Sequence, residues 1–201
     1  MDLNAKGHIS LVVDISGHGF GHLGQVSPVI HALLARWPQA RIVVRSAHEG
    51  AFVRDFIGSA IEVDELSPEA TLILRGPTAV DAASSVEAYR ALHAQWEEHL
   101  DREAARLAAP NPAALISDIP YVSLAAAKRI GVPAIALCSL NWADIYRMYY
   151  GEANDAPAIL EAIESAYRSA DVFLQPRPHM SMAAFPNRRS IGPIARIGRN
   201  R

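Results

Sequence analysis

Residues 9–22 read ISLVVDISGHGFGH, and the architecture of this 201-residue chain can be worked out from them. Ile9 to Ile15 is mostly apolar and rich in β-branched residues, which is typical of a buried parallel strand. Ser16 to His22 is rich in glycine, and Leu23 to Trp37 carries apolar residues at helical spacing. A strand, a glycine-rich turn and a helix in this order place backbone N–H groups and a helix N-terminus at a ligand.

The rest of the chain continues this alternation and predicts one doubly wound α/β domain, residues 1–175, with a mostly parallel, Rossmann-like sheet. Residues 176–201 are rich in proline, glycine and arginine and are predicted to be an exit segment or linker. Residues 71–74 fit either a strand or a loop. Further strands are expected at 41–45, 60–63, 113–117, 134–138 and 172–174, and helices at 48–57, 80–108, 121–130, 143–150 and 157–169.

The composition excludes several classes of protein. A formal net charge of −2 gives no reason to expect nucleic acid as a partner. No run approaches the about 18 apolar residues of a transmembrane helix, and the polar N-terminus does not resemble a signal peptide, so a cytoplasmic location is expected. The single cysteine, Cys138, rules out an intramolecular disulfide, and its apolar surroundings predict a buried, inert thiol.

Three polar turns follow predicted strands: Ser16 to His22, Ser117 to Pro120 and Ser139 to Trp142. If the first strand and the strand at 113–117 are neighbours, His22 and Asp118 meet across the crevice at the carboxyl edge of the sheet. A carboxylate bonded to one imidazole nitrogen fixes the tautomer and makes the other nitrogen a better base. We interpret His22 as a general base for a hydroxyl group, with Asp118 orienting it.

Plainer interpretations of the same residues stay open. His22 replaces the third glycine of a dinucleotide-binding turn, and Arg45 and Ser46 stand where that site needs an acidic residue. His18 fits a structural loop residue as well as a ligand contact. Asp118 and Asn141 each fit the cap of the following helix, and Trp142 fits packing alone. The glycines between the two histidines argue against a zinc pair on one helix, so no metal is expected.

Taken together, four motifs resemble a known family. Residues 16–22 are similar to the opening loop of predicted glycosyltransferases related to the bacterial N-acetylglucosaminyltransferase that completes lipid II, and more so to the glycosyltransferase-like N-terminal region of plant arabinokinases. Residues 116–120 (ISDIP) resemble that group's V-S-D-x-x-P turn, and residues 139–146 (SLNWADIY) resemble its N-F-x-W-D-x-I-Y segment, with a shifted spacing. Residues 184–187 (AFPN) resemble its P-A-F-P element.

The resemblance implies the N-terminal, acceptor-binding half of a GT-B glycosyltransferase. It implies a nucleotide-sugar as co-substrate, a hydroxyl acceptor, no metal or other cofactor, His22 as the base and Asp118 as its partner. A donor-binding C-terminal domain is then expected beyond Arg201, and the isolated chain is expected to be inactive. The substrate-binding residues implied are Gly17, His18, Gly19, Phe20, Gly21, Asn141 and Trp142.

Two alternatives to a transferase remain. One is a non-catalytic domain that binds a sugar or sugar phosphate, as the likeness to arabinokinases permits. The other is an enzyme similar to nucleotide-sugar 2-epimerases, although the carboxylate bases expected there are not evident. The acceptor, the donor sugar, the stereochemical outcome and the oligomeric state have no signature in the sequence.

Overall fold

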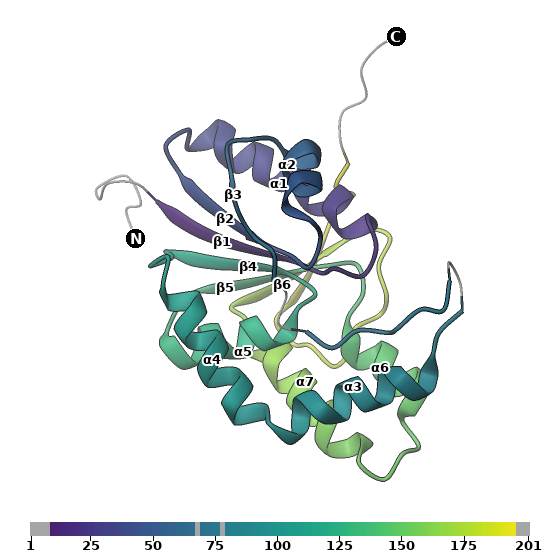
Figure 1. The fold of residues 1–201 in the computed structure, drawn as a ribbon. Helices are drawn as coiled ribbons and strands as arrows, with labels where there is room; N and C mark the ends of the chain where they lie inside the picture. Colours follow the sequence, from purple (N-terminus) through teal and green to yellow (C-terminus); the bar gives the residue numbers. More distant parts are fainter. Residues whose placement is uncertain (1–8, 67–68, 77–78, 196–201) are drawn as a thin grey trace.

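Seven parallel strands form one sheet in the order β3-β2-β1-β4-β5-β6-β7 (Figure 1). The computed structural model describes residues 9–66, 69–76 and 79–195. The parallel pairing and the order of these strands confirm the doubly wound α/β fold predicted from the sequence. The strands are β1 (Ser10–Ile15), β2 (Arg41–Arg45), β3 (Glu62–Asp64), β4 (Ala114–Asp118), β5 (Ala134–Leu137), β6 (Val172–Pro176) and β7 (Arg188–Ile191).

Helices cover both faces of the sheet, and each face has its own apolar core (Figure 1). Helices α1 and α2 pack on one face over Val13, Ile15 and Val44, while α3 to α7 pack on the other over Val12 and Leu115. In the described part of the chain, no helix has both the length and the apolar character needed to cross a bilayer. The helices are α1 (Gly21–Arg36), α2 (Gly50–Ile57), α3 (Ala82–Ala94), α4 (Trp96–Ala108), α5 (Tyr121–Ile130), α6 (Trp142–Tyr150) and α7 (Ala156–Ser169).

The strand order reverses between β1 and β4, which are direct neighbours although the chain visits β2 and β3 between them. In their register Val13 lies opposite Ile116, and Ile15 lies opposite Asp118. The N–H of Ser16 donates to the carbonyl of Asp118 across 3.4 Å, so the two turns begin side by side. Ligands of open parallel sheets bind at such a reversal, outside the carboxyl ends of the strands.

The sheet extends beyond the predicted domain boundary. Residue 176 is the last residue of β6, and β7 pairs with β6 from Arg188 to Ile191. The division at 175/176 therefore does not separate a domain from a linker, because a strand of the same sheet lies within the predicted exit segment. Residues 196–201 of that segment lie outside the described residues.

The single helix predicted over residues 80–108 is two helices. Gln95 leaves the helical conformation at φ −119° between α3 and α4, and its N–H bonds the carbonyl of Leu92 at 3.3 Å. At this break the rings of His93 and Trp96 stack, with centroids 5.0 Å apart, and both stack on Tyr121 of α5. No glycine or proline marks the break in the sequence; the aromatic contacts with α5 accompany it instead.

A buried charge cluster joins the ends of β1 and β2. Arg45 donates to both carboxylate oxygens of Asp14 at 2.5 and 2.6 Å and forms an ion pair with Glu103 of α4 at 2.5 Å. Burial raises the pKa of Glu103 to about 7, although the charge of Arg45 acts in the opposite direction. The residue that ends β2 is thus a cation with internal partners, which is consistent with the sequence argument against a dinucleotide site.

Candidate active site

His22 and Asp118 meet at the reversal of strand order, as the sequence predicted. His22 lies in the first turn of α1 and Asp118 is the last residue of β4; Nδ1 of the imidazole and Oδ2 of the carboxylate are 3.0 Å apart. Asp118 is fully buried and His22 is 9% exposed. When the ring is neutral and Nδ1–H donates to Asp118, Nε2 is the nitrogen that accepts a proton.

The surroundings of His22 favour its protonated form. Burial alone lowers the pKa of the imidazole, but the charge of Asp118, the hydrogen bond to it and the charge of Glu69 together raise the pKa above its ordinary value. A stronger base than free imidazole results, held in one orientation by a carboxylate. This arrangement can accept a proton from a hydroxyl group that approaches Nε2.

The turn that carries Asp118 has a strained backbone. Ile119 has φ +74°, a conformation that costs a β-branched residue about 1–3 kcal/mol. The Tyr167 hydroxyl donates to the carbonyl of Ile119 at 2.6 Å, and the Ser117 hydroxyl donates to that of Pro120 at 2.6 Å. The residue at the N-cap of α5 is Pro120, so the carboxylate of Asp118 is directed to His22 and does not cap the helix.

Two of the three glycines of the turn are required by its shape. A Cβ on Gly17 would lie 2.8 Å from the Cβ of Ala47, and Gly19 has φ +81°. Three N–H groups of the run from Gly17 to Gly21 are used internally: that of Gly17 donates to Glu69, that of His18 to Ser16 Oγ and that of Gly19 to the carbonyl of Gly17. The expectation that the whole run offers N–H groups to a ligand is thus narrowed to Phe20 and Gly21.

Glu69 is a residue of the site that the sequence analysis missed. Its Oε1 accepts the N–H of Gly17 at 3.1 Å, its Oε2 accepts the indole N–H of Trp142 at 3.0 Å, and it also bonds Ser16. Burial raises the pKa of Glu69, and these hydrogen bonds oppose that rise. Its segment, between β3 and α3, has neither periodicity nor a motif, so no sequence signal identified it.

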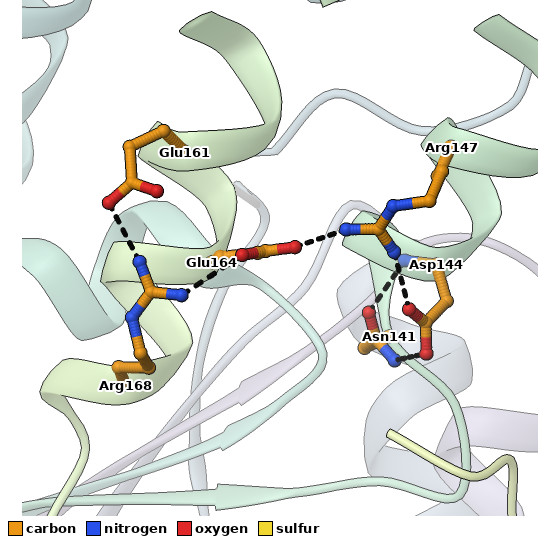
Figure 2. A network of polar contacts seen from close by, with 6 residues as sticks. All are labelled: Asn141, Asp144, Arg147, Glu161, Glu164 and Arg168. Atoms are coloured by element: carbon orange, nitrogen blue, oxygen red, sulfur yellow. Dashed lines mark hydrogen bonds and ion pairs between the residues drawn. The ribbon is translucent and has the colours of Figure 1, made fainter. Parts of the chain in front are cut away.

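Asn141 and Trp142 belong to the internal framework of the site. Asn141 is fully buried and caps α6: its Oδ1 accepts the N–H of Asp144 at 2.8 Å and its Nδ2 donates to the Asp144 carboxylate at 2.8 Å. Figure 2 shows this cap continuing through Arg147 and Glu164 to α7. Trp142 is 1% exposed, and its indole N–H is bonded to Glu69. Both side chains are buried, and the direct substrate contacts expected of them stay a prediction.

His18 and Phe20 flank the turn differently. The half-buried ring of His18 packs edge-on against Trp142, with centroids 5.3 Å apart, and burial followed by the charge of His22 lowers the pKa of His18. Phe20 is 64% exposed and its ring stacks with His48 at 5.4 Å and contacts Phe52 at 5.0 Å. We call Phe20, His48 and Phe52 the aromatic patch. It is an apolar surface beside the base.

Cys138 lies beside the same carboxylate. It is buried, as predicted, and its pKa is raised well above the ordinary value by burial and by the charge of Asp118. Ligand atoms of His22, Asp118 and Cys138 lie within 4.8 Å of one another, close enough to hold a metal ion in this part of the described structure. Two of these atoms already bond each other, and the absence of a metal requirement stays a prediction.

A cavity of about 370 Å³ opens beside the first turn of α1. The terminal nitrogens of Arg177 make no hydrogen bond or ion pair with another described residue, and Nε2 of Gln25 is likewise without a partner among them. The exposed Arg177 therefore presents its terminal nitrogens near the N-terminus of α1, whereas Nε2 of Gln25 is buried. The cavity is lined by Gly21, Gly24, Gln25, Ser139, Pro176, Arg177, Pro178 and Ile194.

Solved glycosyltransferases share this fold. A UDP-glucosyltransferase from Polygonum tinctorium superposes with a TM-score of 0.59 at 14% identity, covering 96% of this chain and 55% of the enzyme. A UGT transferase from Siraitia grosvenorii, solved with UDP, gives 0.54 at 14% identity, with coverages of 96% and 52%. MurG from Acinetobacter baumannii gives 0.50 at 14% identity, with coverages of 94% and 47%. The chain therefore has the Rossmann-like α/β fold of GT-B glycosyltransferases.

One curated protein is similar in sequence. L-arabinokinase from Arabidopsis thaliana is 23% identical over 143 residues, which are 71% of this chain and 14% of that protein. No protein-family model matches the chain. This chain thus spans about half of the solved enzymes and a smaller part of the arabinokinase.

Proposed function

We propose that this chain is the acceptor-side half of a glycosyltransferase in which His22 is the general base. The observation that carries the proposal is the hydrogen bond of 3.0 Å between His22 and Asp118 at the point where the strand order reverses. The base lies on the first turn of a helix, next to a glycine-rich turn and an exposed aromatic patch. An acceptor hydroxyl that reaches Nε2 meets a base whose other nitrogen is already engaged.

The chemistry follows from this geometry. Nε2 takes the proton of the acceptor hydroxyl while the acceptor oxygen forms a bond to the anomeric carbon of the donor. The bond from that carbon to the phosphate oxygen breaks at the same time, and the nucleoside diphosphate leaves with the electron pair. The carboxylate of Asp118 stabilises the imidazolium that results. Such general-base catalysis contributes about 10²–10⁴-fold to a rate.

The donor is proposed to be a UDP-sugar, because solved neighbours include a UDP-glucosyltransferase and an enzyme bound to UDP. The chain spans about half of those enzymes, so a second domain is proposed to supply the rest of the donor site. The cavity beside Gly21, with Arg177 and Ser139 in its lining, faces the same helix N-terminus as His22. It is a suitable place for polar groups of the donor to approach.

The proposal is tested with the complete gene product that carries this sequence. Release of UDP from UDP-glucose and UDP-N-acetylglucosamine is measured with a panel of free sugars as acceptors. His22→Ala is expected to remove transfer, whereas His31→Ala, an exposed histidine on the same helix, is expected to retain it. Full transfer by His22→Ala with sugar binding intact would show that the base assignment is wrong.

A second candidate is a non-catalytic domain that binds a sugar or sugar phosphate. The observation in its favour is the similarity to L-arabinokinase, of which this chain covers 14%. It predicts saturable sugar binding, measured by calorimetry, without UDP release from any UDP-sugar. It also predicts that His22→Ala weakens binding no more than the loss of one hydrogen bond, about 0.5–1.5 kcal/mol.

A further inference from the structure

Glu69 places a carboxylate where the glycine-rich turn would otherwise offer an N–H group to a ligand. A strand, a turn and a helix N-terminus form a general binding site for anions, because N–H groups converge there. Here the N–H of Gly17 is bonded to Oε1 of Glu69 at 3.1 Å, and Ser16 is bonded to the same carboxylate. The start of the turn therefore already holds an anion, and that anion is part of the chain.

We propose that Glu69 is a specificity determinant, which makes the start of the turn, at Ser16 and Gly17, accept a neutral hydroxyl group and exclude a phosphate. The inference rests on the proposed function, because it assigns the class of acceptor. The part of the acceptor that lies next to His22 is expected to be polyhydroxylated and uncharged. It also narrows the expectation that the N–H groups from Gly17 to Gly21 bind phosphate or sugar hydroxyls, because it leaves only the neutral hydroxyls at the start of the turn.

The carboxylate is held in place from its other side. Oε2 accepts the indole N–H of Trp142 at 3.0 Å, and the backbone N–H of Trp142 donates to the hydroxyl of Tyr167 at 3.2 Å. Trp142 and Tyr167 are both buried. Glu69 therefore cannot turn away from an incoming anion without breaking contacts that reach into the core.

Repulsion and competition act together against an anionic ligand. A phosphate at Gly17 would face the carboxylate of Glu69 at close range and would find the N–H group already bonded; a neutral hydroxyl meets no such repulsion and can donate to the carboxylate. The exclusion is local, because the first turn of α1 has no acidic residue and Arg177 lines the cavity beside Gly21. A diphosphate can approach that end of the loop.

The experiment titrates inorganic phosphate into the protein at mildly alkaline pH, which favours the ionised form of Glu69 against the burial that raises its pKa. The amide resonance of Gly17 and the indole N–H resonance of Trp142 report on the site. In the wild type the Gly17 resonance is expected not to respond. In Glu69→Gln it is expected to respond with an affinity for phosphate higher by about tenfold or more, since the like charge is gone.

Glu65→Gln is the matched control, because Glu65 also accepts a glycine N–H, that of Gly50 at 2.9 Å, and lies on the same segment. It is expected to leave phosphate binding at Gly17 as in the wild type. Two results would overturn the inference: a wild-type Gly17 resonance that titrates with phosphate, or a folded Glu69→Gln variant with no gain. The wild-type arm needs no variant and no transfer assay, so it stands apart from the test of His22.

Discussion

The two ends of the glycine-rich turn are built differently. At the start of the turn, Ser16 and Gly17 are hydrogen-bonded to Glu69, which is also hydrogen-bonded to the buried Trp142. At its end, Phe20 is 64% exposed and contacts the rings of His48 and Phe52, the other members of the aromatic patch. His22 follows directly after this exposed end, but its imidazole is hydrogen-bonded to the buried carboxylate of Asp118.

The two ends of the turn differ in how firmly they are held. Buried hydrogen bonds fix the start, whereas the exposed aromatic side chain at the end can adapt. A general base works when its geometry is set before the substrate arrives, which buried hydrogen bonds achieve. An exposed aromatic surface contributes contact area without fixing one ligand. In the proposed function, the turn thus joins a rigid side that carries the base to an exposed aromatic surface for the acceptor.

The largest expected effect on transfer comes from a variant that removes the base but keeps the hydrogen bond to the buried Asp118. His22→Asn offers an amide N–H in place of Nδ1–H, so the bond to Asp118 can persist. Transfer is expected to fall by about 10²–10⁴-fold, while the melting temperature changes little. Rate measurement and thermal unfolding on the same preparation check this. A melting temperature that falls markedly together with the transfer rate would mean that the main role of His22 is to stabilise the fold.

Asp118→Asn tests whether the buried carboxylate tunes the base. Transfer is expected to fall by about 10²-fold, the lower end for general-base catalysis. Since Asp118 raises the pKa of His22, the variant should lower it, and the acidic limb of the pH–rate profile should move to lower pH. An unchanged limb would contradict the assignment.

The same pair has a signature in stability. The raised pKa of His22 stabilises the folded protein below the pKa of the unfolded chain, and this contribution is lost as the pH rises through the folded value. Asp118→Asn should remove that contribution, so its deficit in free energy of unfolding should be larger at low pH. Denaturant titrations at several pH values measure it.

Trp142→Phe loosens the start of the turn without touching the base. It removes the indole N–H that Glu69 accepts at 3.0 Å, and a hydrogen bond to a charged group contributes about 1.5–3 kcal/mol to stability. Urea unfolding measures the loss. Trp37→Phe, at the far end of α1, is the control, and an equal loss there would show that the bond to Glu69 is not the cause.

The smallest effect is expected at the exposed end. Phe20→Ala should change the free energy of unfolding by less than about 0.5 kcal/mol and weaken acceptor binding by about 0.5–1.5 kcal/mol. Calorimetric titration of an acceptor found in the transfer assay measures it. Met148→Ala, exposed on α6, should change neither quantity. A stability loss at Phe20 as large as at Trp142 would remove the contrast between the two ends.

The sequence predicted the parts of the molecule that local patterns encode. Apolar runs located six of the seven strands, whereas the adjacency of β1 and β4, on which the meeting of His22 and Asp118 depended, was a condition that the structure supplied. The strand at Arg188–Ile191 was missed because its residues are mostly exposed and polar at the sheet edge. The break at Gln95 was missed because aromatic contacts with α5, and no helix-breaking residue, accompany it.

Within the site, long-range contacts were the part that no pattern revealed. Glu69 reaches Gly17 from 52 positions away, and Tyr167 reaches Ile119 from 48 positions away. Asn141 and Trp142 were recognised as residues of the site, but their burial depends on α6 and α7, which the sequence does not place relative to the turn. Motifs identify such residues; tertiary contacts decide what each one does.

The strained residue next to Asp118 couples the chemistry to the core. Ile119 is 1% exposed, so its side chain is packed in the same core as Tyr167, and that packing holds a backbone conformation the residue would otherwise leave. We expect that heat which loosens this core lets Ile119 relax and turns Asp118 away from the imidazole. If the proposed function holds, inactivation is expected to precede global unfolding on warming, and adaptation to temperature would proceed through substitutions beneath the site.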